Sequence, residues 1–179
     1  DHELDIKDND IVLDIGGHIG LFALFASQFC KKGKIFCFEP IKENYDILLE
    51  NLELNAIKNI IPFNLAVYDD SKKVKMYLNE DDAGHSIVLP SSKSIQADSI
   101  SLKKIFDDNK IDICDFAKID CEGSEYGIID ALPQEYLKRI NKMAIEYHFA
   151  DSKPELANNL ISKIENADFI LTEGEPLFD

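Results

Sequence analysis

Short apolar runs alternate with stretches of helical periodicity at the start of the chain. Residues 11–15 and 35–39 are candidates for buried strands, because each is a short run of mostly branched or aromatic apolar side chains. Residues 19–29 lie between them and are apolar nearly all round, which predicts a buried helix that ends before Gly33. This order of strand, helix and strand predicts parallel pairing with a right-handed crossover.

The same alternation continues through the rest of the chain. A second helix is predicted after Pro40, and the polar stretch over residues 79–94 is predicted to be a long functional loop. Further strands are predicted at residues 60–67, 74–78, 116–120, 142–148 and 169–172, and further helices at residues 102–106, 124–132 and from Pro154 onward. We therefore predict an α/β fold with a doubly wound, mostly parallel sheet, forming one domain over residues 1–179 and stopping where one more strand could follow.

The charge balance is strongly acidic, and this narrows the range of partners. Lysine and arginine total 19 against 34 aspartate and glutamate residues, which gives a net charge of −15. A surface with this charge repels phosphate backbones, so we expect no nucleic-acid partner. No apolar run is long enough to cross a bilayer, so we expect a soluble, cytoplasmic protein with no membrane partner. The oligomeric state stays open.

The cysteines give no sign of a metal or redox motif. They are Cys30, Cys37, Cys114 and Cys121, and none of them forms a C-x-x-C pair. We expect packed free thiols in a reducing compartment.

The strongest local signal is the glycine-rich turn from Asp14 to Gly20, which includes Gly16 and Gly17. A dinucleotide fingerprint would need glycine at Ile15, and an acid at the end of the strand would repel a pyrophosphate. The same acid tolerates a sulfonium cofactor with an ammonium group, so the turn favours S-adenosylmethionine over NAD. Glu39 ends the next strand about 20 residues further on, where an acid normally accepts the ribose hydroxyls.

Several segments, in order, resemble the FkbM-type methyltransferases, a class I family with a Rossmann-like fold that uses S-adenosylmethionine. They are residues 12–20, 38–40, 64–67, 84–87, 118–125 and 145–148, of which Lys118 to Glu125 resembles the characteristic K-x-D-x-E-G-x-E. The resemblance implies methyl transfer to an oxygen of a small-molecule or carbohydrate-like acceptor, with Asn64 and Ala66 on the adenine side of the cofactor. Gly17-His18 departs from the family's usual alanine and asparagine, which leaves the contact made by His18 open.

Acidic residues and a histidine gather at the predicted ends of two neighbouring strands. Asp120, Glu122 and Glu125 lie where a strand gives way to a helix, so they either complement the helix dipole or face a ligand. We favour a role for Asp120 in cofactor binding and catalysis, and for Glu122 in catalysis. His148 is the candidate base, with Glu146 on the same strand face, against the alternative of an ordinary surface histidine.

The mechanism favoured by these residues is direct displacement, in which the acceptor oxygen attacks the sulfonium methyl in line. Carboxylates also suit magnesium or calcium, but their spacing matches no dedicated metal loop, so we expect no metal. We predict that the acceptor binds under the loop over residues 79–94, which contains His85. Two alternatives remain open: a nicotinamide-dependent oxidoreductase, and a non-catalytic module that binds a nucleotide or a partner.

Overall fold

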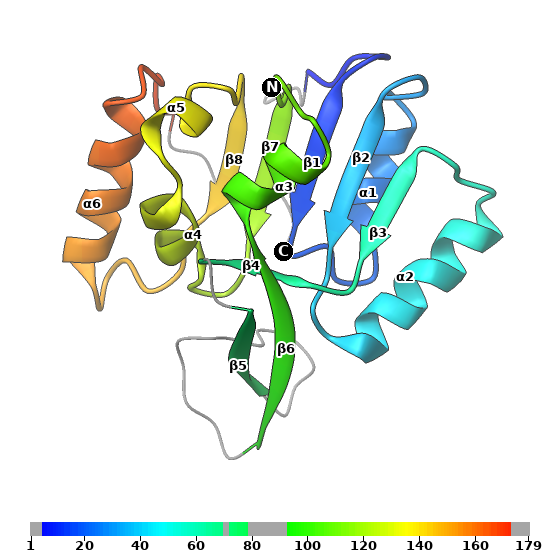
Figure 1. The fold of residues 1–179 in the computed structure, drawn as a ribbon, viewed down its shortest axis with the longest axis horizontal. Helices are drawn as coiled ribbons and strands as arrows, with labels where there is room; N and C mark the ends of the chain where they lie inside the picture. The colour runs from blue at the N-terminus through cyan, green and yellow to red at the C-terminus, as the bar shows by residue number, and fades with distance from the viewer. Residues whose placement is uncertain (1–4, 70–71, 79–92, 173–179) are drawn as a thin grey trace.

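Five parallel strands form the central sheet of the computed structural model, which describes residues 5–69, 72–78 and 93–172 (Figure 1). The strand order is β3-β2-β1-β7-β8, so the chain starts in the middle of the sheet and winds outward in both directions. The strands are β1 (Ile11–Ile15), β2 (Lys34–Phe38), β3 (Ile60–Phe63), β7 (Phe116–Asp120) and β8 (Met143–Glu146). Their carboxyl ends meet at one edge, which is where ligands bind in open sheets of this kind.

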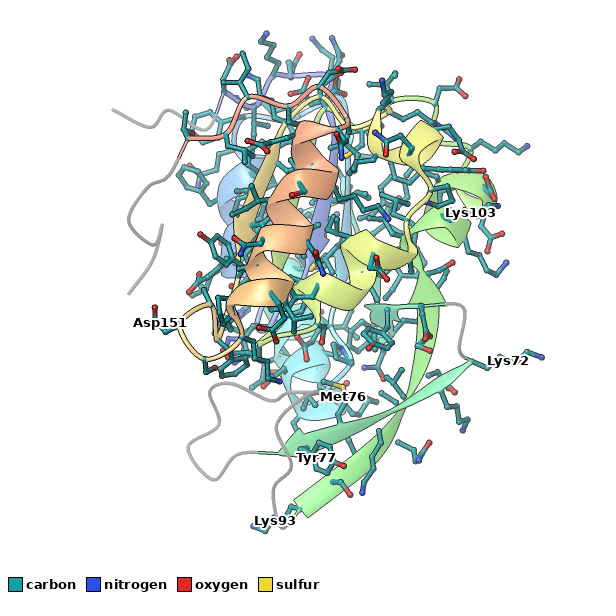
Figure 2. All side chains as sticks on the ribbon, turned by 90° about the vertical axis from the view of Figure 1, so that its left-hand side faces the viewer. Lys72, Met76, Tyr77, Lys93, Lys103 and Asp151 are labelled. Atoms are coloured by element: carbon teal, nitrogen blue, oxygen red, sulfur yellow. The ribbon has the colours of Figure 1, made fainter. Side chains whose placement is uncertain are left out.

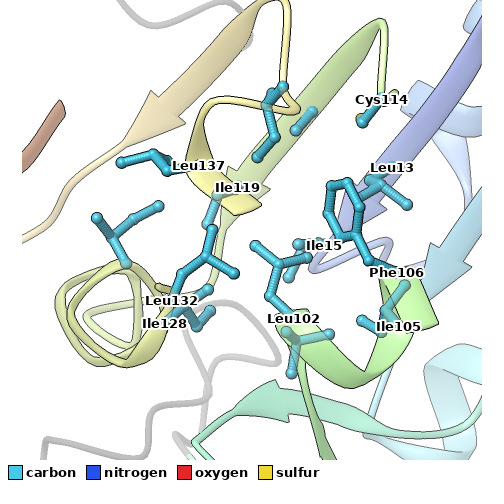
Figure 3. Packing of buried hydrophobic residues seen from close by; sticks show 14 of the residues in the cluster. Leu13, Ile15, Leu102, Ile105, Phe106, Cys114, Ile119, Ile128, Leu132 and Leu137 are labelled. Carbon is cyan, nitrogen blue, oxygen red and sulfur yellow. The ribbon is translucent and has the colours of Figure 1, made fainter. Parts of the chain in front are cut away.

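Helices cover both faces of this sheet because successive strand residues point to opposite sides. On one face, Val12 and Ile35 pack under α1 (Leu21–Ser27) and α2 (Lys42–Leu54). On the other face, Leu13 and Ile15 pack under the remaining helices, as Figure 3 shows for α3 and α4. These helices are α3 (Leu102–Asp108), α4 (Glu125–Ala131), α5 (Gln134–Leu137) and α6 (Pro154–Glu165). The alternation in the strands thus produces two separate cores.

A smaller sheet extends beyond the carboxyl edge of the central one (Figures 1 and 2). It has the order β4-β6-β5, with β4 (Ala66–Tyr68) parallel to β6 (Lys93–Ser101) and β5 (Lys73–Leu78) antiparallel to it. Its own apolar cluster consists of Ile41, Ala66, Val74, Met76 and Ala97. The small sheet therefore stands over the edge where a ligand is expected, and it is held there by a core of its own.

Four details differ from the sequence-based predictions. The run over residues 60–67 forms two strands in different sheets, β3 and β4, because the chain turns at Asn64, whose amide nitrogen donates to the carbonyls of Glu39 and Pro40. The strand predicted at residues 169–172 is absent, and the Ile170 side chain is 93% exposed. Strand β6 and helix α5 were not predicted, and β6 includes the last two residues of the predicted loop over residues 79–94.

Candidate functional site

The glycine turn after β1 is held against the ends of both neighbouring strands. The backbone N–H groups of Gly16 and Gly17 both donate to the carbonyl of Phe38, at 3.1 and 2.9 Å. Gly16 has a φ of +82°, and a Cβ added there would lie 1.8 Å from the carbonyl oxygen of Asp120. Only glycine combines this left-handed conformation with so close an approach to β7. The turn therefore lies at the junction of β1, β2 and β7.

Asp14 lies beneath this turn, fully buried. Lys118 is its counter-charge: the Lys118 Nζ is 3.8 Å from Asp14 Oδ1 and 3.0 Å from Asp120 Oδ2. The same Nζ donates to the carbonyl of Gly16 at 3.1 Å. Burial raises the pKa of Asp14, although Lys118 opposes the shift. Asp14 Oδ1 is buried without a hydrogen-bond partner within the described part of the chain.

Lys118 stays charged between these two carboxylates. Burial on its own would lower the pKa of Lys118, but the charges of Asp14 and Asp120 outweigh it and raise the pKa. Sequence reasoning assigned no role to this lysine. The signal was present, because Lys118 and Asp120 are two residues apart on one strand and so share a face.

Glu39 follows β2, and its carboxylate organises the loops around it. One oxygen accepts the backbone N–H of His18 at 2.8 Å, and the other accepts the backbone N–H of Ile41 at 2.8 Å. The side chain is only 5% exposed, and burial raises the pKa of Glu39. The Asn44 side chain also donates to this carboxylate, which can accept up to four hydrogen bonds, so capacity is left for a hydroxyl of a ligand. His18 contributes through its backbone here, and it adopts a φ of +49°.

The two residues predicted on the adenine side have supporting positions. Asn64 ties the ends of the strands together, with its amide nitrogen 2.9 Å from the Glu39 carbonyl oxygen and 3.0 Å from that of Pro40. Ala66 is buried in the small sheet, 3% exposed. Gly20 adopts a φ of +88° and lies against Leu48, where it allows α1 to begin close to α2.

His148 is the centre of the acidic cluster at the ends of β7 and β8. Its Nδ1 is 3.2 Å from Oε1 of Glu125, which is fully buried and also accepts the backbone N–H of Cys121 at 2.7 Å. Its Nε2 is 3.5 Å from Glu122 Oε2 and 3.8 Å from Glu146 Oε1. The structure thus brings together the residues that the sequence placed at these strand ends, and it adds Glu125 as the carboxylate that orients the ring.

These carboxylates change the proton affinity of the ring. The hydrogen bond with Glu125 is the largest of the effects that raise the pKa of His148 to about 9. The negative charges of Glu125, Glu122 and Asp120 act in the same direction, and partial burial opposes them. Burial raises the pKa of Glu122, and the charge of His148 opposes that shift. At neutral pH the imidazole therefore holds a proton in the protein as it stands.

Three of these groups lie near enough to hold a cation together. One ligand atom from each of Asp120, Glu146 and His148 falls within 4.8 Å of the others. Acidic groups often gather on a surface in this way without an ion, and Glu146 is half-exposed. The predicted loop over residues 79–94, with His85, lies outside the described residues except for its last two positions.

The cysteines are free thiols, as predicted. Cys30, Cys37 and Cys114 are buried and Cys121 is partly buried. Burial raises the pKa of the Cys37 thiol. The Cys37 sulfur packs against Gly17 and would lie only 2.2 Å from a Cβ added there.

A parallel sheet in this order, with a glycine turn after its first strand and an acid after its second, defines a Rossmann-like methyltransferase domain. Solved structures share this fold: a methyltransferase FkbM from Methylobacillus flagellatus superposes with a TM-score of 0.63 over 92% of this chain and 40% of that one, at 19% identity. The family model for the methyltransferase FkbM domain matches residues 14–171. The chain belongs to this family of methyltransferases.

Curated relatives are distant. Methyltransferase sdnD from Sordaria araneosa is 23% identical over 183 aligned positions, covering 82% of this chain and 70% of the relative. Hexuronic acid methyltransferase AglP from Haloferax volcanii is 24% identical over 157 positions, covering 88% of this chain and 63% of the relative. The chain thus spans about two thirds of the length of these proteins. Among the described residues, no helix has the length and apolar character needed to traverse a bilayer.

Proposed function

We propose that the protein transfers a methyl group from S-adenosylmethionine to a hydroxyl oxygen of a small-molecule or carbohydrate acceptor. The observation that carries this proposal is the meeting of two groups at one sheet edge. The glycine turn with Glu39 follows β1 and β2, and the cluster around His148 follows β7 and β8. Family membership favours methyl transfer over the nicotinamide-dependent alternative.

The residues around the turn fit a nucleoside cofactor with a cationic amino-acid end. The glycines let the turn pack closely onto the ends of β2 and β7, and Glu39, which already accepts three hydrogen bonds, has capacity for one more from a ribose hydroxyl. Asp120 lies beside the turn, and the buried Oδ1 of Asp14 accepts no hydrogen bond from the described residues, although Lys118 lies 3.8 Å from it as a counter-charge. When bound, S-adenosylmethionine supplies an electrophilic methyl group on a sulfonium sulfur.

The chain's own contribution to the reaction is to orient the acceptor and to take its proton. Glu125 holds the Nδ1 of the His148 ring, and the Nε2 on the opposite side of the ring lies near Glu122. This Nε2 is the proposed base. In this scheme the charge of Glu122 stabilises the ring once it has taken the proton, and Asp120 positions the cofactor. No metal takes part, so an excess of chelator should leave the rate unchanged.

The acceptor class is supported by the charge of the chain and by its family. A net charge of −15 disfavours a nucleic-acid backbone, and one relative is named as a methyltransferase of hexuronic acid. We propose a cytoplasmic protein that acts on small molecules or glycans.

Calorimetry tests the cofactor assignment. We expect S-adenosylmethionine and its demethylated product to bind and NAD to give no binding signal; the reverse result would contradict the proposal.

Glu39→Ala should weaken cofactor binding by roughly 1–3 kcal/mol, because a charged acceptor of ribose hydroxyls is lost. Glu39→Gln keeps one carbonyl oxygen and should lose less, and Lys58→Gln, an exposed change beyond α2, is the control. Retained cofactor affinity without any turnover would point to a non-catalytic module.

A further inference from the structure

A pocket of about 320 Å³ opens between helices α4 and α6 and is closed on one side by Tyr68 of β4. The side chains that give it chemical character are Tyr68, Tyr126, Phe149, Lys153, Asn159 and Lys163. None of these residues belongs to the glycine turn or to the acidic cluster. In the view of Figure 2, helix α6 faces the reader on the side of the molecule that carries this pocket.

Packing of Tyr68 against α4 fixes one wall of the pocket. A Cβ added to Gly127 would lie 2.5 Å from the Tyr68 ring, so glycine is what lets the ring lie directly on the helix. The Tyr126 hydroxyl donates to the carbonyl of His148 at 2.5 Å, which fixes a second aromatic residue. Aromatic faces in such fixed positions suit the apolar C–H surface of a compact ring.

The charge of the pocket is opposite to that of the protein. Two lysines line it against one acid, Asp130, although the whole chain carries −15. Lys163 donates to the backbone carbonyl of Asp130 at 2.5 Å. Lys153 is half-buried, and within the residues that the structure describes it forms no ion pair. A lysine ammonium at the wall of a pocket that has no counter-ion among the described residues is a ready partner for a carboxylate.

The pocket adjoins the proposed reaction site through the backbone. Two residues of the pocket lining, Phe149 and Gly123, directly follow the proposed catalytic residues His148 and Glu122 in the sequence. Neighbouring Cα atoms along the chain are about 3.8 Å apart. Tyr126, which lines the pocket, also contacts the His148 carbonyl, so the pocket borders the backbone of the proposed base.

We propose that this pocket binds a carboxylate on the acceptor, so that the preferred acceptor is a sugar acid and Lys153 is a specificity-determining residue. The inference rests on the proposed function, since it concerns the acceptor of that reaction. The aromatic walls take the ring of the sugar, the ammonium of Lys153 takes its carboxylate, and a ring hydroxyl is left to face His148.

The test uses two probes that differ only in the carboxylate: methyl glucuronoside and methyl glucoside. Transfer of labelled methyl from S-adenosylmethionine is measured for both, and their binding is measured by calorimetry in the presence of the demethylated cofactor. We expect kcat/KM for the glucuronoside to exceed that for the glucoside by roughly tenfold or more, the size expected for one charge-assisted hydrogen bond.

Lys153→Gln should remove most of this preference, whereas Lys58→Gln at an exposed position beyond α2 should keep it. Equal use of both probes, or equal effects of the two variants, would overturn the inference while leaving methyl transfer intact. Binding of neither probe would also overturn it. A third outcome separates the two proposals. If the cofactor binds and the glucuronoside binds selectively, but no methyl group is transferred to any acceptor, the proposed function is rejected and the carboxylate-binding role of the pocket stands.

Discussion

His148 is surrounded by more negative charge than a single imidazole can balance. Glu125 holds its Nδ1, Glu122 and Glu146 lie near its Nε2, and Asp120 adds a further charge. Sequence reasoning placed all of these residues at neighbouring strand ends, because parallel strands end at a common edge. It did not show that the buried Glu125 would orient the ring, since the direction of a side chain depends on tertiary packing.

Replacing His148 tests its role as the base. His148→Ala should lower turnover by about 10²–10⁴-fold with little change in cofactor affinity, because a proton acceptor is lost and the cofactor contacts remain. Steady-state rates and calorimetry measure the two effects. A nearly unchanged turnover would move the role to Glu122 or to water.

The pH profile follows from the same site. Because the pKa of His148 is raised to about 9, only its deprotonated fraction can accept a proton, and kcat/KM should rise with pH, with a midpoint near 9 and a plateau above it. Glu125→Gln removes the largest cause of this shift, so the midpoint should move toward lower pH. A profile that is already flat at neutral pH would contradict His148 as the base.

Stability should respond to pH in the opposite direction. A group whose pKa is higher in the folded protein stabilises the fold below its unfolded pKa, and the stabilisation is lost as pH rises through the folded value. For His148 this window runs from 6.5 to about 9. The proposed base thus loses its contribution to the fold in the pH range where it would become able to accept a proton.

At the scale of the elements, the buried strands and most helices were predictable from hydrophobic periodicity alone. The observed β1 matches the prediction, and α6 begins at Pro154 as expected. The failures have physical causes. Residues 169–172 were predicted as a strand from their composition, but Ile170 is exposed and forms no sheet contact. Strand β6 is mostly polar, so its pairing with β5 leaves little trace in the hydrophobic pattern.

The glycine turn gives a prediction at this scale. Gly16→Ala should destabilise the fold by at least roughly 1–3 kcal/mol, because alanine is strained at a φ of +82° and its Cβ would meet the Asp120 carbonyl oxygen. Denaturant unfolding measures the change, with Lys58→Gln as the control. A variant as stable as the parent would show that the turn is less tightly packed against β7 than the structure indicates.

At the scale of the whole molecule, net charge gives a prediction about partners. We propose that the net charge of −15 disfavours nucleic-acid acceptors, since salt would weaken such repulsion without reversing it. We expect labelled methyl groups to enter glycans or small hydroxyl compounds and not total RNA. A screen over these three pools measures this, and label found only in RNA would contradict the assignment.

The small sheet beyond the carboxyl edge has its own apolar cluster, built around Val74, Met76 and Ala97. Its middle strand β6 and its edge strand β5 contribute none of the residues that hold the glycine turn. Their buried residues pack against Ile41, whose N–H holds Glu39, so substitutions that leave the cofactor half of the molecule undisturbed are those at exposed positions of these strands. Inheritance can treat the two faces of the small sheet differently: one lineage keeps the buried face that supports Glu39 while its descendants diversify the exposed face.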